Sequence, residues 1–300
     1  GSSPGTIAAD ARLREHAGFD GIWTAETNHD PFLPLMLAAE HTDRVQLGTA
    51  IAVAFARSPM SMAYVAHDLQ VHSRGRFILG LGSQVRAHVH HRFSMPWSHP
   101  ARRMREYIQA LRAIWTAWNA GERLHFRGEF YSHTLMTPFF CPEPSPWGPP
   151  RVYLAAVGEQ MTQVAGEVGD GLLPHPFTSV QYLRERTLPA LEKGLTASGR
   201  TRTNIDISLN VLVVSGRTEE QMTAAAHAVR EQIAFYASTP TYRAVLDLHG
   251  WGDLGEELSR RARIGLSDAG QRMGELIDDT MLRTFAVVAE PDQVGGEILR

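Results

Sequence analysis

Two side chains that could move protons, Glu26 and His29, stand close together after a short apolar run at residues 22–24. The imidazole of histidine changes its charge near neutral pH, so His29 could give or take a proton in an acid–base step. The carboxylate of Glu26 could orient that imidazole. The alternative is that His29 is an ordinary histidine of a loop or a helix start. The pair marks a candidate catalytic site, and either residue could be the catalytic one.

A second group of chemically competent side chains comprises His88, His90, His91 and His99. This spacing could hold a divalent metal, but no nearby carboxylate or cysteine completes a set of ligands. The apolar residues around them, such as Trp97, favour the rim of a substrate pocket instead. We therefore predict no metal site.

Composition excludes several classes of protein. The chain has 300 residues, of which 43% are hydrophobic and 20% charged, with a formal net charge of −3. Nothing here is typical of a disordered chain, and there is no basic patch to attract a nucleic acid. Cys141 is the single cysteine, which excludes an internal disulfide, and its proline-rich surroundings favour a loop thiol without a catalytic role. No apolar run reaches the roughly 18 residues of a membrane span, and no signal sequence is visible, so we expect a cytoplasmic protein.

Apolar runs that alternate with amphipathic segments predict parallel strands joined by helices. After the run at 45–53, Ser58 and Pro59 have the residue types of a helix start. A helix is also expected to end at Gly18, before the first run. Eight strands would close a barrel, and since the chain begins almost directly in a helix, a first strand could be absent. The predicted strands are 18–24, 45–53, 77–82, 152–158, 171–173, 205–214 and 285–288.

The alternation is interrupted near residues 85–100, 121–150 and 236–280. A chain of this length can form one large core, and we expect a single domain over residues 1–300. Long insertions in a barrel usually lie on the ligand face. These segments are therefore expected to shape access to a site.

Four motifs, in this order, resemble the bacterial luciferase-like superfamily, and specifically its oxidoreductases that depend on the deazaflavin coenzyme F420. They are GFDGIWTAETNHDPF, LGTAIAVAFARSP, GRFILGLGSQV and YLAAVGEQMTQVAGEVGDGLL. The resemblance is clearest from residue 18 to residue 173. It implies an α/β fold, a TIM (β/α)8 barrel with insertions. In such a barrel the cofactor ring lies over the carboxyl ends of the strands.

The resemblance places the cofactor ring against Thr49, Ala50 and Ile51, with a non-prolyl cis peptide between the last two. Gly82 and Ser83 end the next strand, where a hydroxyl could hydrogen-bond the polar edge of the ring. The alternatives are a plain buried strand end for the first segment and an ordinary helix cap for the second.

In the superfamily, the cofactor phosphate lies on the loop that starts a later helix, where backbone N–H groups attract anions. Glu159 departs from that pattern, because a carboxylate near a phosphate repels it unless it points away. The alternative is that small residues here only allow a strand and a helix to pack. The matching residues are Ala155, Ala156, Val157, Gly158, Glu159, Gln160 and Met161.

Relatives often carry an acidic residue followed by histidine at the end of the first predicted strand. Here Glu26 and His29 are separated by two residues, which leaves the assignment open. The aromatic residues that we expect in the substrate pocket compete with core packing as an explanation, above all at Trp23. They are Trp23, Trp97, His175 and Phe177.

The resemblance thus implies an F420-dependent oxidoreductase that transfers a hydride between the deazaflavin and a small organic substrate. An FMN-dependent luciferase-like monooxygenase is the alternative enzyme, and a non-catalytic barrel that binds F420 is the alternative of another class. Homodimers are common in the superfamily, and the apolar stripe of the helix expected at 101–120 could support one. We expect no nucleic acid or membrane partner.

Overall fold

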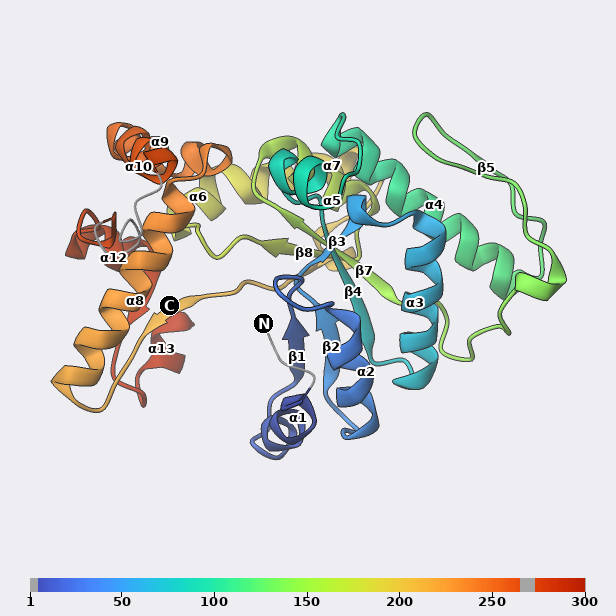
Figure 1. The fold of residues 1–300 in the computed structure, drawn as a ribbon, viewed down its shortest axis with the longest axis horizontal. Coiled ribbons are helices and arrows are strands. Elements are labelled where there is room, and N and C mark those ends of the chain that lie inside the picture. Colours follow the sequence, from blue (N-terminus) through green and yellow to red (C-terminus); the bar gives the residue numbers. More distant parts are fainter. Residues whose placement is uncertain (1–4, 265–272, 300) are drawn as a thin grey trace. The chain divides into compact units, whose positions relative to one another are not determined.

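The computed structural model describes residues 5–264 and 273–299 and divides into two compact units, each with its own hydrophobic core (Figure 1). The first unit holds the segments Gly1–Ala156, Gln160–Leu173 and Leu191–Ile207. The second holds Val157–Glu159, Pro174–Ala190 and Ser208–Arg300.

A curled, parallel sheet forms the centre of the first unit, in the order β1-β2-β4-β7-β8-β9, with β3 paired to β4. This half-barrel confirms the predicted α/β fold class. Parallel strands bring their carboxyl ends to one edge of a sheet, which is where ligands bind in such folds. The strands are β1 (Gly21–Thr24), β2 (Gln46–Thr49), β3 (Ala52–Val53), β4 (Phe77–Gly82), β7 (Arg151–Ala156), β8 (Gly171–Pro174) and β9 (Asp206–Ile207).

One predicted strand is wrong. Residues 205–214, expected as a single strand, hold two strands, β9 (Asp206–Ile207) in the first unit and β10 (Leu212–Val214) in the second. The apolar residues of this run are interrupted by Ser208 and Asn210, and the chain passes between the units at Ser208. β10 then pairs in parallel with β11 (Ala286–Val288), in a sheet separate from the seven-stranded one.

Helices lie along the outer face of the sheet in the first unit, and all of them except α1 come after a strand in the chain (Figure 1). They are α1 (Ile7–His16), α2 (Phe32–Glu40), α3 (Pro59–His72), α4 (Pro100–Ala120), α5 (Glu159–Val168) and α7 (Leu188–Ala197). As predicted, α3 starts at Pro59 with Ser58 as its cap, whose Oγ accepts a hydrogen bond from the N–H of Ser61 at 3.1 Å. Gly18, just after α1, has a φ of +88°, a value that favours glycine.

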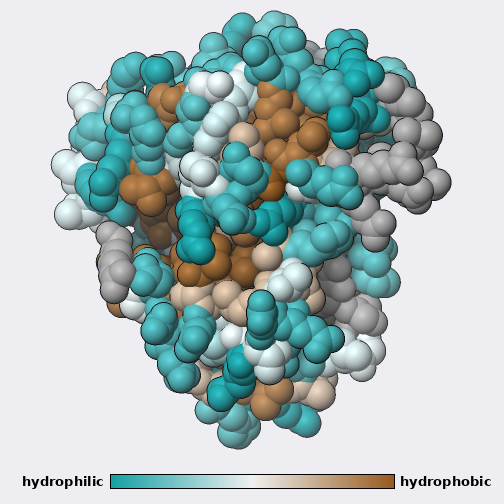
Figure 2. All heavy atoms as spheres, turned by 90° about the vertical axis from the view of Figure 1, so that its left-hand side faces the viewer, coloured by the Kyte–Doolittle hydropathy of each residue, from teal (hydrophilic) through white to brown (hydrophobic). Residues whose placement is uncertain are grey.

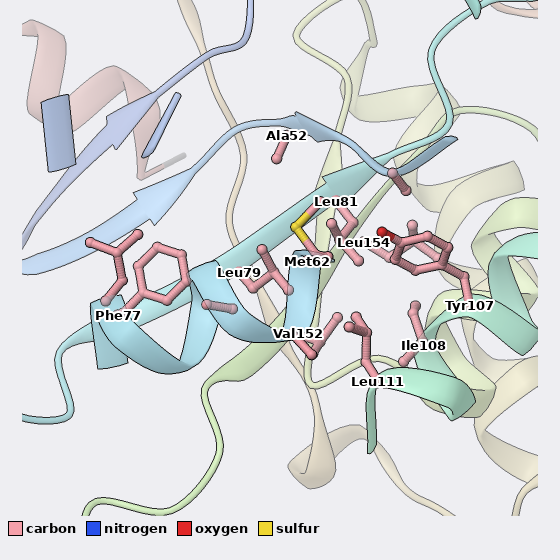
Figure 3. Close-up of a cluster of buried hydrophobic side chains, with 14 of the residues drawn as sticks. Ala52, Met62, Phe77, Leu79, Leu81, Tyr107, Ile108, Leu111, Val152 and Leu154 are labelled. Carbon is pink, nitrogen blue, oxygen red and sulfur yellow. The ribbon is translucent and has the colours of Figure 1, made fainter. Parts of the chain in front are cut away.

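Side chains on the strands alternate between the helices and the inner face of the sheet. Leu79 of β4 and Val152 of β7 belong to the large core on the outer face, together with Met62 of α3 and Leu111 of α4 (Figure 3). Ile78, one residue before Leu79, belongs instead to a small cluster on the inner face. The period of two expected for strands therefore separates a structural face from a face that is available for a site.

The second unit packs helices around Phe177, Ile233, Leu258 and Phe285. Its helices are α6 (Val180–Tyr182), α8 (Glu219–Ala237), α9 (Arg243–Leu248), α10 (Gly252–Ile264), α12 (Asp279–Phe285) and α13 (Val294–Ile298). The insertion predicted near 236–280 includes α9 and α10, and its residues 265–272 lie outside the described structure.

The two other predicted insertions carry short elements. The segment near 85–100 holds a short π-helix, His88–Arg92, and the segment near 121–150 holds a hairpin. That hairpin consists of β5 (Phe126–Arg127) and β6 (Ser132–His133). The remaining short helices are Ala54–Ala56, Pro138–Phe140, Leu183–Thr187, Arg202–Asn204 and Pro240–Tyr242.

Hydrophilic side chains cover most of the face drawn in Figure 2, and hydrophobic residues reach the surface between them. None of the helices within residues 5–264 and 273–299 combines the length and hydrophobicity that crossing a lipid bilayer requires. The most exposed large hydrophobic side chains include Leu135, Phe139, Phe140 and Leu299. They are candidate contacts for a partner, and the homodimer stays a prediction.

Candidate functional site

The inner face of the sheet is built from aromatic rings that lie against glycines of the neighbouring strand. Trp23 pairs in register with Gly48, and a Cβ on Gly48 would come within 2.3 Å of the Trp23 ring. In the same way, a Cβ on Gly171 would come within 2.4 Å of the Tyr153 ring. The two rings lie 5.9 Å apart between centroids. Glycine is thus required at these positions because the aromatic floor occupies the space.

Toward the carboxyl ends of the strands the same face carries small and apolar residues. Ala50, Ile51 and Ala155 are partly exposed and pack against the buried Ile78 cluster. Gly82 ends β4, and a Cβ there would lie 2.8 Å from the Ile51 side chain. Gly82 is buried and the other three residues are partly exposed, and we call these four residues the strand-end surface.

The peptide bond between Ala50 and Ile51 is cis, which confirms the geometry expected from the resemblance. Thr49, just before it, is fully buried. Its hydroxyl donates to the carbonyl oxygen of Gly80 at 2.7 Å and accepts from the Gly80 N–H at 2.9 Å. The Thr49 side chain therefore ties β2 to β4, whereas Ala50 and Ile51 keep their place on the strand-end surface.

Glu26 fastens the same segment from the end of β1. Its N–H donates to the carbonyl oxygen of Ile51 at 3.1 Å, and its Oε2 accepts from the N–H of Val53 at 2.8 Å. Only 8% of Glu26 is exposed. Backbone and side chain of this one residue thus hold the chain on both sides of Ala52.

Arg57 completes this arrangement and was missed by the sequence analysis. Its Nη1 donates to both carboxylate oxygens of Glu26, at 3.0 and 2.8 Å, and its Nη2 donates to Oδ2 of Asp30 at 2.9 Å. Burial lowers the pKa of the Arg57 guanidinium, but the two carboxylates outweigh it, so the pKa is raised. The residue lies inside the quoted motif LGTAIAVAFARSP, directly before the Ser58 cap, which is the signal that could have found it.

Asp30 pairs with Arg57 and also accepts hydrogen bonds from the backbone of the following segment. Its Oδ1 accepts from the N–H groups of Phe32 and Leu33, at 2.8 and 3.3 Å, at the start of α2. The Arg57 guanidinium also lies 5.4 Å from the centroid of the Phe32 ring. The loop from Glu26 to Asp30 is therefore fixed at both ends.

His29 lies between these two fixed ends with an exposed side chain. Within the described part of the chain, no hydrogen bond to its ring is found. Arg92, from the insertion near 85–100, donates to the carbonyl oxygen of Thr27 at 2.6 Å and so contacts the same loop. The structure thus brings His29 and Glu26 to one loop but gives them different surroundings, since Glu26 is buried and paired and His29 is open to solvent.

Ser83 follows Gly82 and is partly buried. Its hydroxyl donates to the carbonyl oxygen of Gln84 at 3.2 Å, and Gln84 has a φ of +59°. Ser83 is therefore the next residue in the chain after Gly82 of the strand-end surface, and it lies in a local turn. Whether its hydroxyl contacts a cofactor stays a prediction.

The predicted phosphate segment runs from the end of β7 into α5, which begins at Glu159. Ala156 is buried, whereas Gly158, Glu159 and Gln160 are exposed. A Cβ on Gly158 would meet no atom within 4 Å, so packing does not explain a glycine there. The segment therefore has the helix start that the sequence analysis expected, with Glu159 at its first position.

The predicted substrate-pocket residues fall in both units. Trp23 belongs to the inner face of the sheet, and Trp97 packs edge-on against the buried Phe55, with centroids 5.7 Å apart. Both lie in the first unit, whereas His175 and Phe177 lie in the second. Each pair is therefore placed within its own unit.

His175 has a distinctive aromatic environment. Its ring stacks on Tyr242, with centroids 4.4 Å apart, and meets Tyr236 edge-on at 4.6 Å. Its Nδ1 accepts from the N–H of Phe177 at 3.1 Å, which places the proton of the neutral ring on Nε2. Burial lowers the pKa of His175 to about 4, so the ring is uncharged at neutral pH.

The histidines of the 85–100 segment lie close to one another, with the rings of His90 and His91 4.7 Å apart between centroids. Among residues 5–264 and 273–299, no group of three or more histidine, cysteine, aspartate or glutamate side chains is placed to hold a metal ion.

Comparison with known proteins agrees with the fold. Residues 1–300 match the family model described as luciferase-like monooxygenase. An uncharacterized protein of Mycobacterium tuberculosis is 57% identical over 99% of this chain and 88% of its own. An F420-dependent glucose-6-phosphate dehydrogenase of Kineococcus radiotolerans is 31% identical over 70% of this chain and 64% of its own. The structure of the coenzyme F420-dependent tetrahydromethanopterin reductase of Methanopyrus kandleri superposes with a TM-score of 0.79, at 23% identity, over 99% of this chain and 86% of that one.

Proposed function

The chain belongs to the luciferase-like monooxygenase family, and from this premise we propose that it is an F420-dependent oxidoreductase that transfers a hydride between the deazaflavin and a small organic substrate. The observation that carries the proposal is the strand-end surface of Ala50, Ile51, Gly82 and Ala155. It lies at the carboxyl ends of β2, β4 and β7, where parallel α/β folds bind their ligands.

The residues of this surface fit a flat, tricyclic ring. Ala50, Ile51 and Ala155 are partly exposed, so they offer apolar contact to a planar group. The Ile51 side chain occupies the space beside Gly82, since a Cβ on Gly82 would lie 2.8 Å from it. A bulkier residue at position 82 or position 51 would make the surface under the ring uneven.

When bound, F420 supplies a two-electron hydride step, and the chain must orient it and manage a substrate proton. The pair of Glu26 and Arg57 holds the segment that carries Ala50 and Ile51. Both Glu26 oxygens are occupied by Arg57 and by the Val53 N–H, which supports a positioning role. The exposed His29 is the better candidate to give or take the substrate proton.

The phosphate of the cofactor would bind at the start of α5. Residues 155–161 supply the end of a strand, exposed small residues and the first turn of a ten-residue helix. The Glu159 carboxylate must point away from a bound phosphate. We therefore assign the phosphate to the backbone of this segment rather than to a charged side chain.

The named relative that is 31% identical is F420-dependent, which supports the choice of cofactor. Its glucose-6-phosphate substrate is a property of that enzyme, and for this chain we propose only a small organic substrate. We further propose that the protein works as a cytoplasmic homodimer. The family description favours a second candidate, an FMN-dependent monooxygenase, because it names monooxygenases. A barrel that binds F420 without a reaction of its own is the third.

Titration of the purified protein with F420 and, separately, with FMN tests the proposal. Cofactor fluorescence and the heat of binding report the two dissociation constants. We expect F420 to bind more tightly than FMN, and to exchange hydride when a substrate is present. A preference for FMN would establish the monooxygenase alternative, and tight F420 binding without turnover over a broad substrate panel would favour the non-catalytic barrel.

A further inference from the structure

A cavity of about 310 Å³ lies between the start of α9 and one face of α10, wholly within the second unit. The two helices pack against each other (Figure 1). Ser259, Arg260 and Arg263 follow Glu256 by three, four and seven residues, which puts the four on one face of α10. We call this space the arginine cavity, and its lining residues are Pro240, Arg243, Glu256, Ser259, Arg260 and Arg263. Its volume is at the lower end of the roughly 300–1,000 Å³ that is typical of small-molecule sites.

The core of the second unit holds the walls of the arginine cavity. Val245 and Leu246 of α9 and Leu258 of α10 are buried in that core. The hydroxyl of Ser259 donates to the carbonyl oxygen of Ser238 at 2.7 Å, which ties α10 to the residue that follows α8. The arginine side chains therefore extend from a packed frame, as a binding site requires.

Carboxylates hold two of the three arginines of the cavity. Arg243 donates from Nη2 to Glu256 at 2.8 Å and from Nε to Asp247 at 3.2 Å. Arg260 donates from Nε and Nη2 to the two oxygens of Glu257, at 2.8 Å each. These pairs orient the guanidinium groups and leave Nη1 of each arginine outside them.

The lining keeps positive charge and N–H donors for a ligand. Within residues 5–264 and 273–299, no hydrogen bond or ion pair of the Arg263 guanidinium is found, and no acceptor is found for Nη1 of Arg243 or of Arg260. A guanidinium group stays charged at every pH that proteins tolerate. Three such groups stand against one lining carboxylate, that of Glu256, so the cavity attracts an anion.

We propose that the arginine cavity binds a phosphate group, free or carried by a small organic molecule. Arginine pairs with phosphate through short, charge-assisted hydrogen bonds. The donors come from two helices, and a tetrahedral phosphate has acceptor oxygens on several sides, whereas a carboxylate is planar and has two. The cavity contains none of the residues of the strand-end surface, so this proposal does not rest on the proposed function. The alternative is that the arginines only stabilise the C-terminal end of α10.

The test is calorimetric titration of the full chain, without F420, with inorganic phosphate, phenyl phosphate and succinate at constant ionic strength. The Arg260 side chain is 63% exposed, so salt screens its charge and we expect a dissociation constant on the order of 1 mM for both phosphates. Succinate should bind more weakly. Tighter binding of phenyl phosphate than of inorganic phosphate would identify an organic phosphate as the ligand, and equal affinities the free ion. Failure of both phosphates to bind, or tighter binding of succinate, would overturn the proposal.

Two substitutions in the lining should change the affinity in opposite directions. Arg263→Gln removes a positive charge and should weaken phosphate binding by roughly 3- to 10-fold, as for a charge-assisted hydrogen bond at an exposed site. Glu256→Gln removes the negative charge of the lining and should strengthen phosphate binding, while its amide oxygen can still accept from Arg243. Damage to the fold would weaken binding in both variants. Wild-type affinity in Arg263→Gln would place the phosphate elsewhere and overturn the assignment.

Arg14→Gln is the matched control, because Arg14 is also an exposed arginine in the last turn of a helix, but in the first unit. It should leave the dissociation constants unchanged, and a loss equal to that of Arg263→Gln would show non-specific attraction and overturn the proposal. The F420 titration is a separate measurement. Phosphate binding that is weakened in Arg263→Gln, in a protein that does not bind F420, would support this site and contradict the proposed function.

Discussion

Arg57 binds the buried carboxylate of Glu26 through a single nitrogen, Nη1, which donates to Oε1 at 3.0 Å and to Oε2 at 2.8 Å. The exposed fractions of the two side chains are 22% and 6%. Glu26 in turn holds the N–H of Val53. This pair therefore connects the candidate catalytic loop to the segment that carries the strand-end surface.

Arg57→Met should destabilise the protein because it leaves the Glu26 carboxylate buried without a cation. Loss of one partner of a buried pair costs roughly 3–5 kcal/mol, and the partial exposure of Arg57 reduces this to about 2–3 kcal/mol. The free energy of unfolding in urea measures the effect. Arg102→Met is the control, since both side chains of the Arg102–Glu129 pair are at least half exposed, and it should cost at most about 1 kcal/mol. Equal losses in the two variants would contradict the structural role of Arg57.

His29→Asn should lower turnover without changing stability or cofactor binding. A positioned general acid or base contributes roughly 10²- to 10⁴-fold, so we expect a loss of at least about 100-fold in kcat. Because His29 is exposed, the free energy of unfolding should stay within about 0.5 kcal/mol of the wild-type value. Steady-state kinetics with F420 and a panel of small organic substrates checks the first part. His125→Asn, at another exposed histidine, is the control, and wild-type turnover in His29→Asn would remove His29 from the mechanism.

Local chemistry explains which features could be predicted from the sequence. The Ser58 cap, the helix end before Gly18 and the alternation of strands and helices depend on neighbouring residues, and the structure confirms them. The cis bond at Ala50–Ile51 followed from the motif resemblance rather than from any local rule.

Features that depend on residues far apart in the chain were missed. Arg57 meets Glu26 and Asp30 only because β1 and β2 pair side by side, and no local pattern marks such an ion pair. The prediction of a single strand over residues 205–214 failed for a similar reason. An apolar run does not show which sheet each of its halves will join. The pairing of Trp23 with Gly48 also needs the strand register, which the sequence alone does not provide.

Gly82→Ala should weaken F420 binding as well as destabilise the fold. The new Cβ would lie 2.8 Å from the Ile51 side chain, which must then move within the strand-end surface. Overpacking of this kind costs roughly 1–3 kcal/mol, and we expect about a tenfold increase in the dissociation constant of F420.

Two further glycine variants serve as comparisons for Gly82→Ala. Gly48→Ala, where the Cβ would meet the Trp23 ring at 2.3 Å, should lower the thermal midpoint. Gly296→Ala is the neutral control, because a Cβ there would meet nothing within 4 Å. Unchanged F420 affinity in Gly82→Ala would exclude the strand-end surface as the place of the ring.

The stability of the protein should fall as the pH decreases from about 6.5 to about 4, and His175 should account for part of that fall. Its pKa is about 4 in the folded protein, against an ordinary value of 6.5, because burial disfavours the charged ring. Between these two values the unfolded chain binds more protons than the folded one, so the free energy of unfolding rises with pH. The contribution is fully present above pH 6.5 and amounts to about 3 kcal/mol, at 1.36 kcal/mol for each of roughly 2.5 pKa units. Urea unfolding at pH 7.5 and pH 4.5 measures it in the wild-type protein and in His175→Gln, which does not titrate there. Subtracting the change in the free energy of unfolding of His175→Gln from that of the wild-type protein removes the contributions of the other titrating groups. An identical loss of stability in both proteins would show that His175 has an ordinary pKa.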